Sequence, residues 1–333
     1  MSFNKIPFIR ILLIITFLLS ATNITADDSF QRVQRTEKMM DTYFTITVYS
    51  DNPDTAEGAI TEAFNKIKEI EYGLNLYNGD SELSRLNRKK ILKSPSDDIR
   101  KNIERALYFS NLTNGAFDIT VQPILDLYNR AFMEKGVAPA GETIKRELKR
   151  VDYRSVLVKE DSITIGDDQV ITLGGIAKGY AVEEAVKILR RHNIAIALID
   201  AGGNMRALGK KPEGVWNIAI EDPRDMSNYI TIIPLNNMAV STSGDYERYF
   251  DNNREYHHII NPKTGYSATE LISATVVTDN AFDADALSTA VFVLGKEKGL
   301  KLIESMPGVE GLIITREREI LRSSGFPEVK DNK

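Results

Sequence analysis

"TLGGIAKGYA", residues 172–181, places three glycines and one lysine between an alternating apolar run and a stretch with helical spacing. Glycine lets the backbone turn tightly or approach a ligand closely, and the start of a helix offers unpaired N–H groups to an anion. The stretch therefore predicts a strand that leads through a turn into a helix. These residues alone leave open whether the turn also binds a ligand, because ordinary strand-to-helix turns commonly contain glycine.

Alternating and helical patterns extend from this turn in both directions. Strands are expected at 43–50, within 155–173 and 194–209, and at 215–223, 229–235, 238–244, 256–262 and 272–280; helices are expected at 52–76, 97–115, 180–193 and 281–306, and a closing hairpin at 309–324. No fixed-period repeat interrupts this order. Runs of strands with intervening helices predict an α+β fold with mostly antiparallel sheets flanked by helices. The segment 136–150 is a candidate division between two lobes of a domain that spans 27–333.

Residues 1–26 have the pattern of a secretory signal peptide. Lys5 and Arg10 precede an apolar run at 11–19. This run is shorter than the roughly 20 residues that a membrane-spanning helix needs. We therefore expect a periplasmic or otherwise exported protein, cleaved near Ala26. An uncleaved segment would instead hold the chain at the inner membrane.

The composition narrows the classes of molecule that the protein is expected to bind. The chain has no cysteine, which excludes disulfides, thiolate metal sites and cysteine nucleophiles. Its formal net charge at pH 7 is −5, and an acidic balance argues against nucleic acid as the partner. An anionic small ligand is still compatible with this balance, because a bound cation supplies local positive charge.

Glycine again accompanies polar side chains in clusters at 114–120, 199–209, 283–289, and 241–246 together with 257–265. This shared character indicates one composite site. Asp285 and Thr289 lie four residues apart at an expected helix start, so their oxygens share one face. Oxygen ligands of this kind suit Mg²⁺, which also binds substrate phosphate. The alternative is that Asp283 or Asp285 only caps the helix.

Familiar catalytic motifs are absent from these clusters. Ser243 lacks the G-x-S-x-G spacing of a nucleophile elbow, and residues 174–179 match neither G-x-G-x-x-G nor the P-loop. His257 and His258 are adjacent, and a strand would point them to opposite faces. One of them is then expected to face the site and the other solvent.

The clusters follow one another along residues 36–315 as LYNGDSELSRLN (76–87), GAFDIT (115–120), GGIAKGYAVE (174–183), AGGN (201–204), Trp216 before Asp222-Pro223, TSGDY (242–246), HIINPKTG (258–265) and DADALSTA (283–290). In this order they resemble the ApbE family, the FAD:protein FMN transferases. The resemblance implies an ApbE-like architecture related to the T-fold, FAD as substrate and Mg²⁺ as cofactor. It also implies an acceptor flavoprotein subunit that is modified on Thr or Ser, with AMP as the other product.

Carried over position by position, the resemblance implies that the cation is held by the Asp285 carboxylate, the Thr289 hydroxyl and the Gly175 carbonyl. The implied cofactor-binding residues are Met40, Tyr77, Ala116, Phe117, Asp118, Thr172, Lys178, His258 and Ile259. Two positions depart from the family pattern. Thr172 stands where relatives have an acidic residue, and Asp41 stands where they have the glycine of Met-Gly-Thr.

His258 is the predicted general base for the acceptor hydroxyl, because the unperturbed pKa of histidine is about 6.5. Asp245 is the second candidate, and both Asp222 and Asp245 also suit structural roles. Two other functions are compatible with the same site. One is a Mg²⁺-dependent FAD pyrophosphatase, in which water replaces the hydroxyl. The other is a periplasmic flavin-binding protein without turnover.

Overall fold

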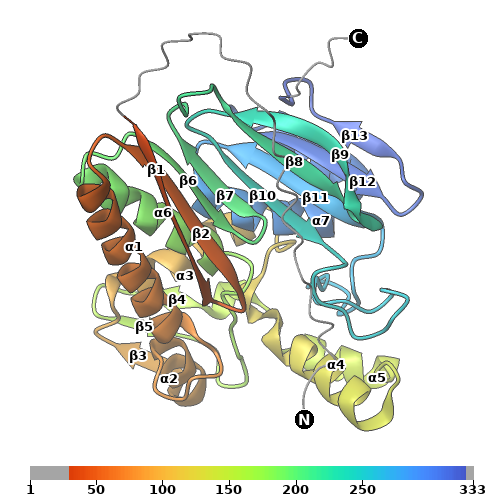
Figure 1. Cartoon of the computed structure of the whole chain (residues 1–333). Helices are drawn as coiled ribbons and strands as arrows, with labels where there is room; N and C mark the ends of the chain where they lie inside the picture. Colours follow the sequence, from red (N-terminus) through yellow and green to blue (C-terminus); the bar gives the residue numbers. More distant parts are fainter. Residues whose placement is uncertain (1–29, 328–333) are drawn as a thin grey trace.

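The computed structural model describes residues 30–327, and the predicted signal peptide at 1–26 lies outside them. Its largest element is an eight-stranded sheet in which neighbouring strands pair antiparallel (Figure 1). The strand order is β1 (Gln31–Met39), β2 (Thr42–Ser50), β6 (Ile196–Ala201), β7 (Asn204–Leu208), β10 (Ala239–Gly244), β11 (Leu271–Thr278), β12 (Glu310–Thr315) and β13 (Ile320–Arg322). Together with its helices, this sheet confirms the expected α+β fold.

Three long helices pack on one face of the sheet, and they are α1 (Pro53–Leu74), α6 (Ala177–Arg191) and α7 (Ala281–Glu304). The helix α1 begins after Asn52, whose side chain accepts a hydrogen bond from the Thr55 N–H. Apolar residues at helical spacing, among them Phe64 and Ile67, are fully buried. They join the inward side chains of the strands in the main hydrophobic core.

A two-stranded hairpin, β8 (Trp216–Asp222) and β9 (Asp225–Leu235), covers part of the opposite face (Figure 1). Burial alternates strictly along β8. Its inward side chains pack on Ala207, Val240 and Val277 of the large sheet. Every residue of β11 is buried as a result. The helix α7 covers one face of this strand, and the hairpin packs on the other face.

The remaining elements surround the large sheet: α2 (Glu82–Lys89), β3 (Ile91–Lys93), α3 (Asp97–Leu112), α4 (Gln122–Lys135), α5 (Gly141–Leu148), β4 (Leu157–Val158), β5 (Ser162–Thr164) and 3-10 turns at Ile119–Val121 and Tyr153–Ser155. The helices α4 and α5 pack with Ile260 in a small hydrophobic cluster of their own. Gly136 ends α4 with a φ of 67°. The division into two lobes near 136–150 stays a prediction.

The strand expected at 256–262 is wrong, and so is the strand expected directly before the glycine turn, because residues 165–173 lie in no strand. Residues 256–262 form only isolated bridges, between Tyr249 and His257 and between Ile260 and Ser267. Turn residues at the end of this segment explain the difference, because the side chain of Asn261 accepts from the Lys263 N–H, and among residues 30–327 the segment pairs with none of the named strands. Within residues 30–327, each helix is too short or too polar to cross a membrane.

Candidate functional site

The glycine loop, residues 172–176, is held in place from two sides. The Thr172 N–H donates to the carbonyl of Ile119 at 2.8 Å. The Thr172 Oγ1 accepts from the Gly174 N–H at 3.3 Å, so threonine closes this short turn with its own side chain. The loop then leads into α6 at Ala177. The expected strand-to-helix turn is thus a fixed loop, although the residues before it lie outside the named strands.

Gly175 brings three predicted clusters together. A Cβ atom on Gly175 would lie 3.3 Å from the Oγ1 of Thr289 and 3.3 Å from the ring of Phe117. Few side chains tolerate such close contacts, so glycine allows the loop to approach both partners. The loop, the segment 114–120 and α7 therefore meet at one place, as the composite site requires.

Asp285 is bound directly to the start of α6. Its Oδ2 accepts a hydrogen bond from the Gly179 N–H at 2.9 Å. The residue is only 5% exposed. Burial raises the pKa of Asp285, while the positive charge of Lys178 and the Gly179 N–H act in the opposite direction. The carboxylate is thus fixed next to the glycine loop rather than serving as the cap of α7, which is Asn280.

Replacing Gly179 by alanine is expected to destabilise the protein. The added Cβ would collide with the carbonyl oxygen of Ala281 and lie 2.7 Å from the Cβ of Asp285. A backbone oxygen cannot rotate away, so α6 and α7 must separate, at a cost of about 3 kcal/mol. Urea unfolding measures this loss. Gly58→Ala is the matched control, because Gly58 is exposed in α1 with open space around it; unchanged stability of Gly179→Ala would contradict the close packing.

A network of hydroxyl and amide groups surrounds Asp285 and Thr289. Ser243 Oγ lies 3.2 Å from Thr289 Oγ1 and 2.9 Å from Ser288 Oγ. The Asn204 amide, oriented to satisfy its neighbours, donates to Asp285 Oδ1 at 3.3 Å and accepts from Lys178 Nζ at 3.2 Å. The clusters 201–204 and 241–246 thereby orient the predicted cation ligands and Lys178.

The ring of His258 is oriented by the backbone of Arg248. The Arg248 carbonyl accepts a hydrogen bond from the backbone N–H of His258 at 3.0 Å, and it lies 2.9 Å from the ring nitrogen Nδ1 of the same residue. A carbonyl can only accept, so Nδ1 carries the proton and Nε2 is the available acceptor. Burial, followed by the positive charge of Arg248, lowers the pKa of His258 well below its usual range. The ring is therefore neutral near pH 7, and Nε2 is the nitrogen that can accept a proton.

His257 does not face solvent, as had been expected for the second histidine. Its side chain is buried, and Nε2 lies 2.9 Å from the carbonyl of Ala268. Its Nδ1 accepts from the Ile259 N–H at 3.3 Å. The expectation failed because this segment is not a strand on the surface but a loop folded onto the core.

Asp245 is bound on both of its carboxylate oxygens, and its role as a base stays a prediction. It is 4% exposed and forms two hydrogen bonds with the guanidinium of Arg224, at 2.7 and 2.6 Å. A carboxylate held in this way is less able to take a proton from a substrate. Asp222 is bound similarly by Arg318, which lowers the pKa of Asp222 to about 2. The structural role that the sequence left open for both residues is the one the structure favours.

The segment 116–118 serves the fold as well as the site. Ala116 and Phe117 are buried. Asp118 accepts hydrogen bonds from the N–H and hydroxyl of Thr120 at 2.8 and 2.6 Å and from the Tyr153 N–H at 3.1 Å. Phe117 lies against Gly175 and is placed as an apolar wall, whereas the carboxylate of Asp118 is already bonded within the chain. Direct contact of Asp118 with FAD stays a prediction.

Met40 and Asp41 form the two-residue turn between β1 and β2, with φ angles of 48° and 61°. A turn of this kind needs positive φ at both positions, which glycine and aspartate adopt with little strain. Asp41 thus keeps a backbone path that glycine would also take. The Met40 N–H donates to Glu71 Oε1 at 2.7 Å. Contact of Met40 with FAD stays a prediction.

Tyr77 and Ile259 lie in opposite surroundings. Tyr77 is 79% exposed, so its ring is accessible from solvent. Ile259 is buried in the main core, and its carbonyl accepts from the Ala268 N–H at 3.0 Å. The backbone of Ile259 supports the adjacent His258. A cofactor contact of either residue stays a prediction.

The predicted cation ligands fit a hard divalent cation. Asp285, Thr289 and Gly175 offer a carboxylate, a hydroxyl and a backbone carbonyl, and Mg²⁺ prefers oxygen donors. Within residues 30–327, no group of three or more His, Cys, Asp or Glu side chains forms a metal site. A site with one carboxylate leaves coordination positions for phosphate oxygens. The donor set therefore suits Mg²⁺ bound together with a dinucleotide.

Comparison with known proteins identifies the family, because a model of the ApbE family matches residues 40–313. The chain belongs to the ApbE family. It is similar to the FAD:protein FMN transferases of Treponema pallidum, 32% identical over 316 residues (88% of this chain, 87% of that protein), and of Haemophilus influenzae, 32% over 314 residues (89% and 91%). The crystal structure of the ApbE protein from Thermotoga maritima is similar with a TM-score of 0.80 and 32% identity, covering 88% of this chain and 97% of that chain. Flavin transferase ApbE from Vibrio cholerae gives 0.79 and 26%, covering 89% and 98%.

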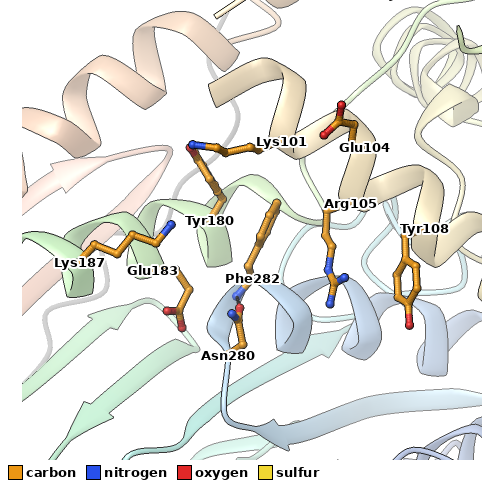
Figure 2. A pocket seen from close by; sticks show the side chains of 9 residues that line it. All are labelled: Lys101, Glu104, Arg105, Tyr108, Tyr180, Glu183, Lys187, Asn280 and Phe282. Atoms are coloured by element: carbon orange, nitrogen blue, oxygen red, sulfur yellow. Dashed lines mark hydrogen bonds between the residues drawn. The ribbon is translucent and has the colours of Figure 1, made fainter. Parts of the chain in front are cut away.

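A groove of about 340 Å³ lies elsewhere on this ApbE-family chain, between α3, α6 and the start of α7 (Figure 2). None of the predicted site residues lines it. Its charged groups are engaged within the chain, since Arg105 bonds Asp283 and Glu183 accepts from the Ala281 N–H at 2.6 Å. We assign no ligand to this groove.

Sequence reasoning missed the supporting residues of the ApbE site. The sequence alone indicates Ser243 only as a weak candidate nucleophile and Asn204 only as part of a glycine turn, and it gives no signal for Arg248. A motif gives residue types but not the direction of their side chains, so the hydrogen bonds of Ser243 and Asn204 emerge only when β7, β10 and α7 are placed together.

Proposed function

We propose that this chain transfers FMN from FAD to the hydroxyl of a Thr or Ser residue in an acceptor flavoprotein subunit, with Mg²⁺ held by Gly175, Asp285 and Thr289. The observation that carries the proposal is the contact of the glycine loop with α7, which puts Gly175 against Thr289 and Gly179 against Asp285. The relatives named FAD:protein FMN transferase support it, since they match 88% and 89% of this chain.

The groups around the loop suit a dinucleotide. A divalent cation at these oxygens would neutralise the diphosphate and the charge that develops on departing AMP. Lys178 lies beside Asn204 and Asp285, where its amino group can donate to a phosphate oxygen. Phe117, against Gly175, provides an apolar surface for the flavin half.

His258 supplies the base in this proposal. Its Nε2 takes the proton from the acceptor hydroxyl, while Nδ1–H stays bonded to the Arg248 carbonyl. The hydroxyl oxygen forms a bond to the FMN phosphorus, the bond from that phosphorus to the bridging oxygen breaks, and AMP leaves with that oxygen. The products are the phosphoester-linked FMN protein, AMP and one proton held by His258.

The same proposal places the chain outside the cytoplasm. The signal-peptide pattern of residues 1–26 supports export, and the absence of cysteine makes folding independent of the redox state of that compartment. A retained segment would keep the protein at the inner membrane.

Metal removal is the experiment that tests the proposed function. The full chain is incubated with FAD, Mg²⁺ and a flavoprotein subunit, and mass spectrometry follows the mass of FMN on a Thr or Ser. We expect equal amounts of modified subunit and AMP, and loss of both products in excess EDTA, because the oxygen donors alone cannot neutralise the diphosphate. Equally fast release of AMP and FMN without the subunit would indicate a pyrophosphatase, and bound FAD without any AMP would indicate a carrier.

A further inference from the structure

Arg248 reaches the glycine loop from the segment between β10 and β11. Its Nη2 would lie 3.8 Å from a Cβ atom on Gly174. Gly174 is exposed and carries no side chain, so nothing of its own separates the guanidinium from the loop backbone. A ligand that lies on the glycine loop therefore comes within reach of this cation.

The Arg248 side chain has no hydrogen-bond or ion-pair partner among residues 30–327, whereas nearby arginines are engaged. Arg224 binds Asp245, Arg318 binds Asp222 and Arg254 donates to the Pro223 carbonyl. Arg248 is exposed and keeps all of its donors available. A role of the Arg248 side chain in stabilising the fold of its own loop therefore does not explain where this side chain lies.

A second positive charge, on Lys178, acts on the same histidine as Arg248 in a chain that is acidic overall. The formal net charge is −5. Even so, Arg248 and Lys178 both act on His258 as positive charges, and both lower its pKa. Arg248 lies against Gly174 of the glycine loop, and Lys178 follows the loop by two residues in α6, so two cations border the loop and suit an anion with more than one charge.

Resting on the proposed function, we infer that the guanidinium of Arg248 binds the diphosphate of FAD at the glycine loop and positions the FMN phosphorus for attack. The planar guanidinium can donate to two phosphate oxygens at once, which fixes direction as well as distance. The carbonyl of the same residue holds the ring of His258. One residue therefore sets the phosphate and the base relative to each other.

Binding measurements on Arg248→Ala and Arg248→Lys test this inference in the full chain. We expect Arg248→Ala to weaken the affinity for FAD and for ADP about ten- to a hundredfold, because one charge-assisted hydrogen-bonding group is lost. Riboflavin, which has no phosphate, should bind both proteins equally. Arg248→Lys should recover part of the affinity, since the charge is kept and the two-point geometry is lost.

Arg254→Ala is the matched control, because it removes the same charge from the same loop while its side chain points to Pro223. Its FAD and ADP affinities should stay within about twofold of the native chain. Native affinity in Arg248→Ala, or an equal loss in Arg254→Ala, would overturn the inference. Failure of the proposed function gives a different result: the native chain binds ADP in an Arg248-dependent way but never forms the FMN protein.

Discussion

Replacing His258 by alanine is expected to slow FMN transfer about a hundred- to ten-thousandfold at saturating FAD, because a positioned general base contributes a factor of this size. The Arg248 carbonyl orients the ring so that Nε2 accepts the proton. Loss of the ring leaves the acceptor hydroxyl, a poor nucleophile near neutral pH, without an acceptor for its proton. Single-turnover formation of AMP and of the FMN protein measures the change.

The pH dependence follows from the lowered pKa of His258. The neutral ring is the active base, and a pKa well below about 6.5 keeps it neutral at and below that pH. The rate of the native protein is therefore expected to hold as the pH falls through about 6.5, and to decline only in more acidic solution. A decline centred at or above that value would show that the pKa of the base is not lowered, which contradicts the desolvated surroundings of His258 next to Arg248.

His192 offers a matched control for the histidine substitution. It lies at the surface end of α6, with Nε2 2.7 Å from the carboxylate of Glu62. His192→Ala should transfer FMN at the native rate, because an exposed pair of this kind contributes little. Equal losses in His192→Ala and His258→Ala would point to a general effect on folding, and a native rate in His258→Ala would place the base elsewhere.

Replacing Asp285 by asparagine is expected to reduce Mg²⁺-dependent transfer about a thousandfold or more. The amide oxygen of asparagine can still accept the Gly179 N–H, so the contact between α6 and α7 is kept. The negative charge that attracts the cation is lost, and with it several kcal/mol of stabilisation of the phosphoryl transition state. Transfer rates across a Mg²⁺ titration measure the effect.

Asp283→Asn controls for the loss of one carboxylate from the same helix. Asp283 is bonded to Arg105 at 2.7 Å, away from the glycine loop. Its substitution should leave the Mg²⁺ dependence unchanged. Native transfer by Asp285→Asn at low Mg²⁺ would contradict the assignment of Asp285 as a cation ligand. Loss of folded structure, measured by circular dichroism, would also contradict it, because the carboxylate would then be needed for the fold.

The sequence alone predicts the secondary structure wherever apolar residues recur at one constant spacing along a long segment. The helical spacing in α1 and the alternation in β2 and β8 each arise from a single buried face, and a single face leaves a readable pattern. The segment around His258 has no such period, because its contacts are with separate turns and helices. It was therefore mistaken for a strand.

The candidate site was predictable in its residue types and not in their pairings. Gly175, Asp285 and Thr289 were found because motif order placed them, and the structure brings their segments together. The engagement of Asp245 with Arg224 could not be foreseen, since the two residues are 21 positions apart. The same holds for Arg248, which carries no motif signal and becomes relevant only through its distance to Gly174.

The burial of β11 on both faces determines which parts of the protein open to solvent first. Strands covered on both sides open to solvent only when most of the domain unfolds, whereas loops with their own small apolar contacts open more readily. The helix that presents Asp285 and Thr289 rests on β11. The predicted cation ligands on α7, Asp285 and Thr289, are therefore expected to stay ordered even when the loop that carries His258 opens.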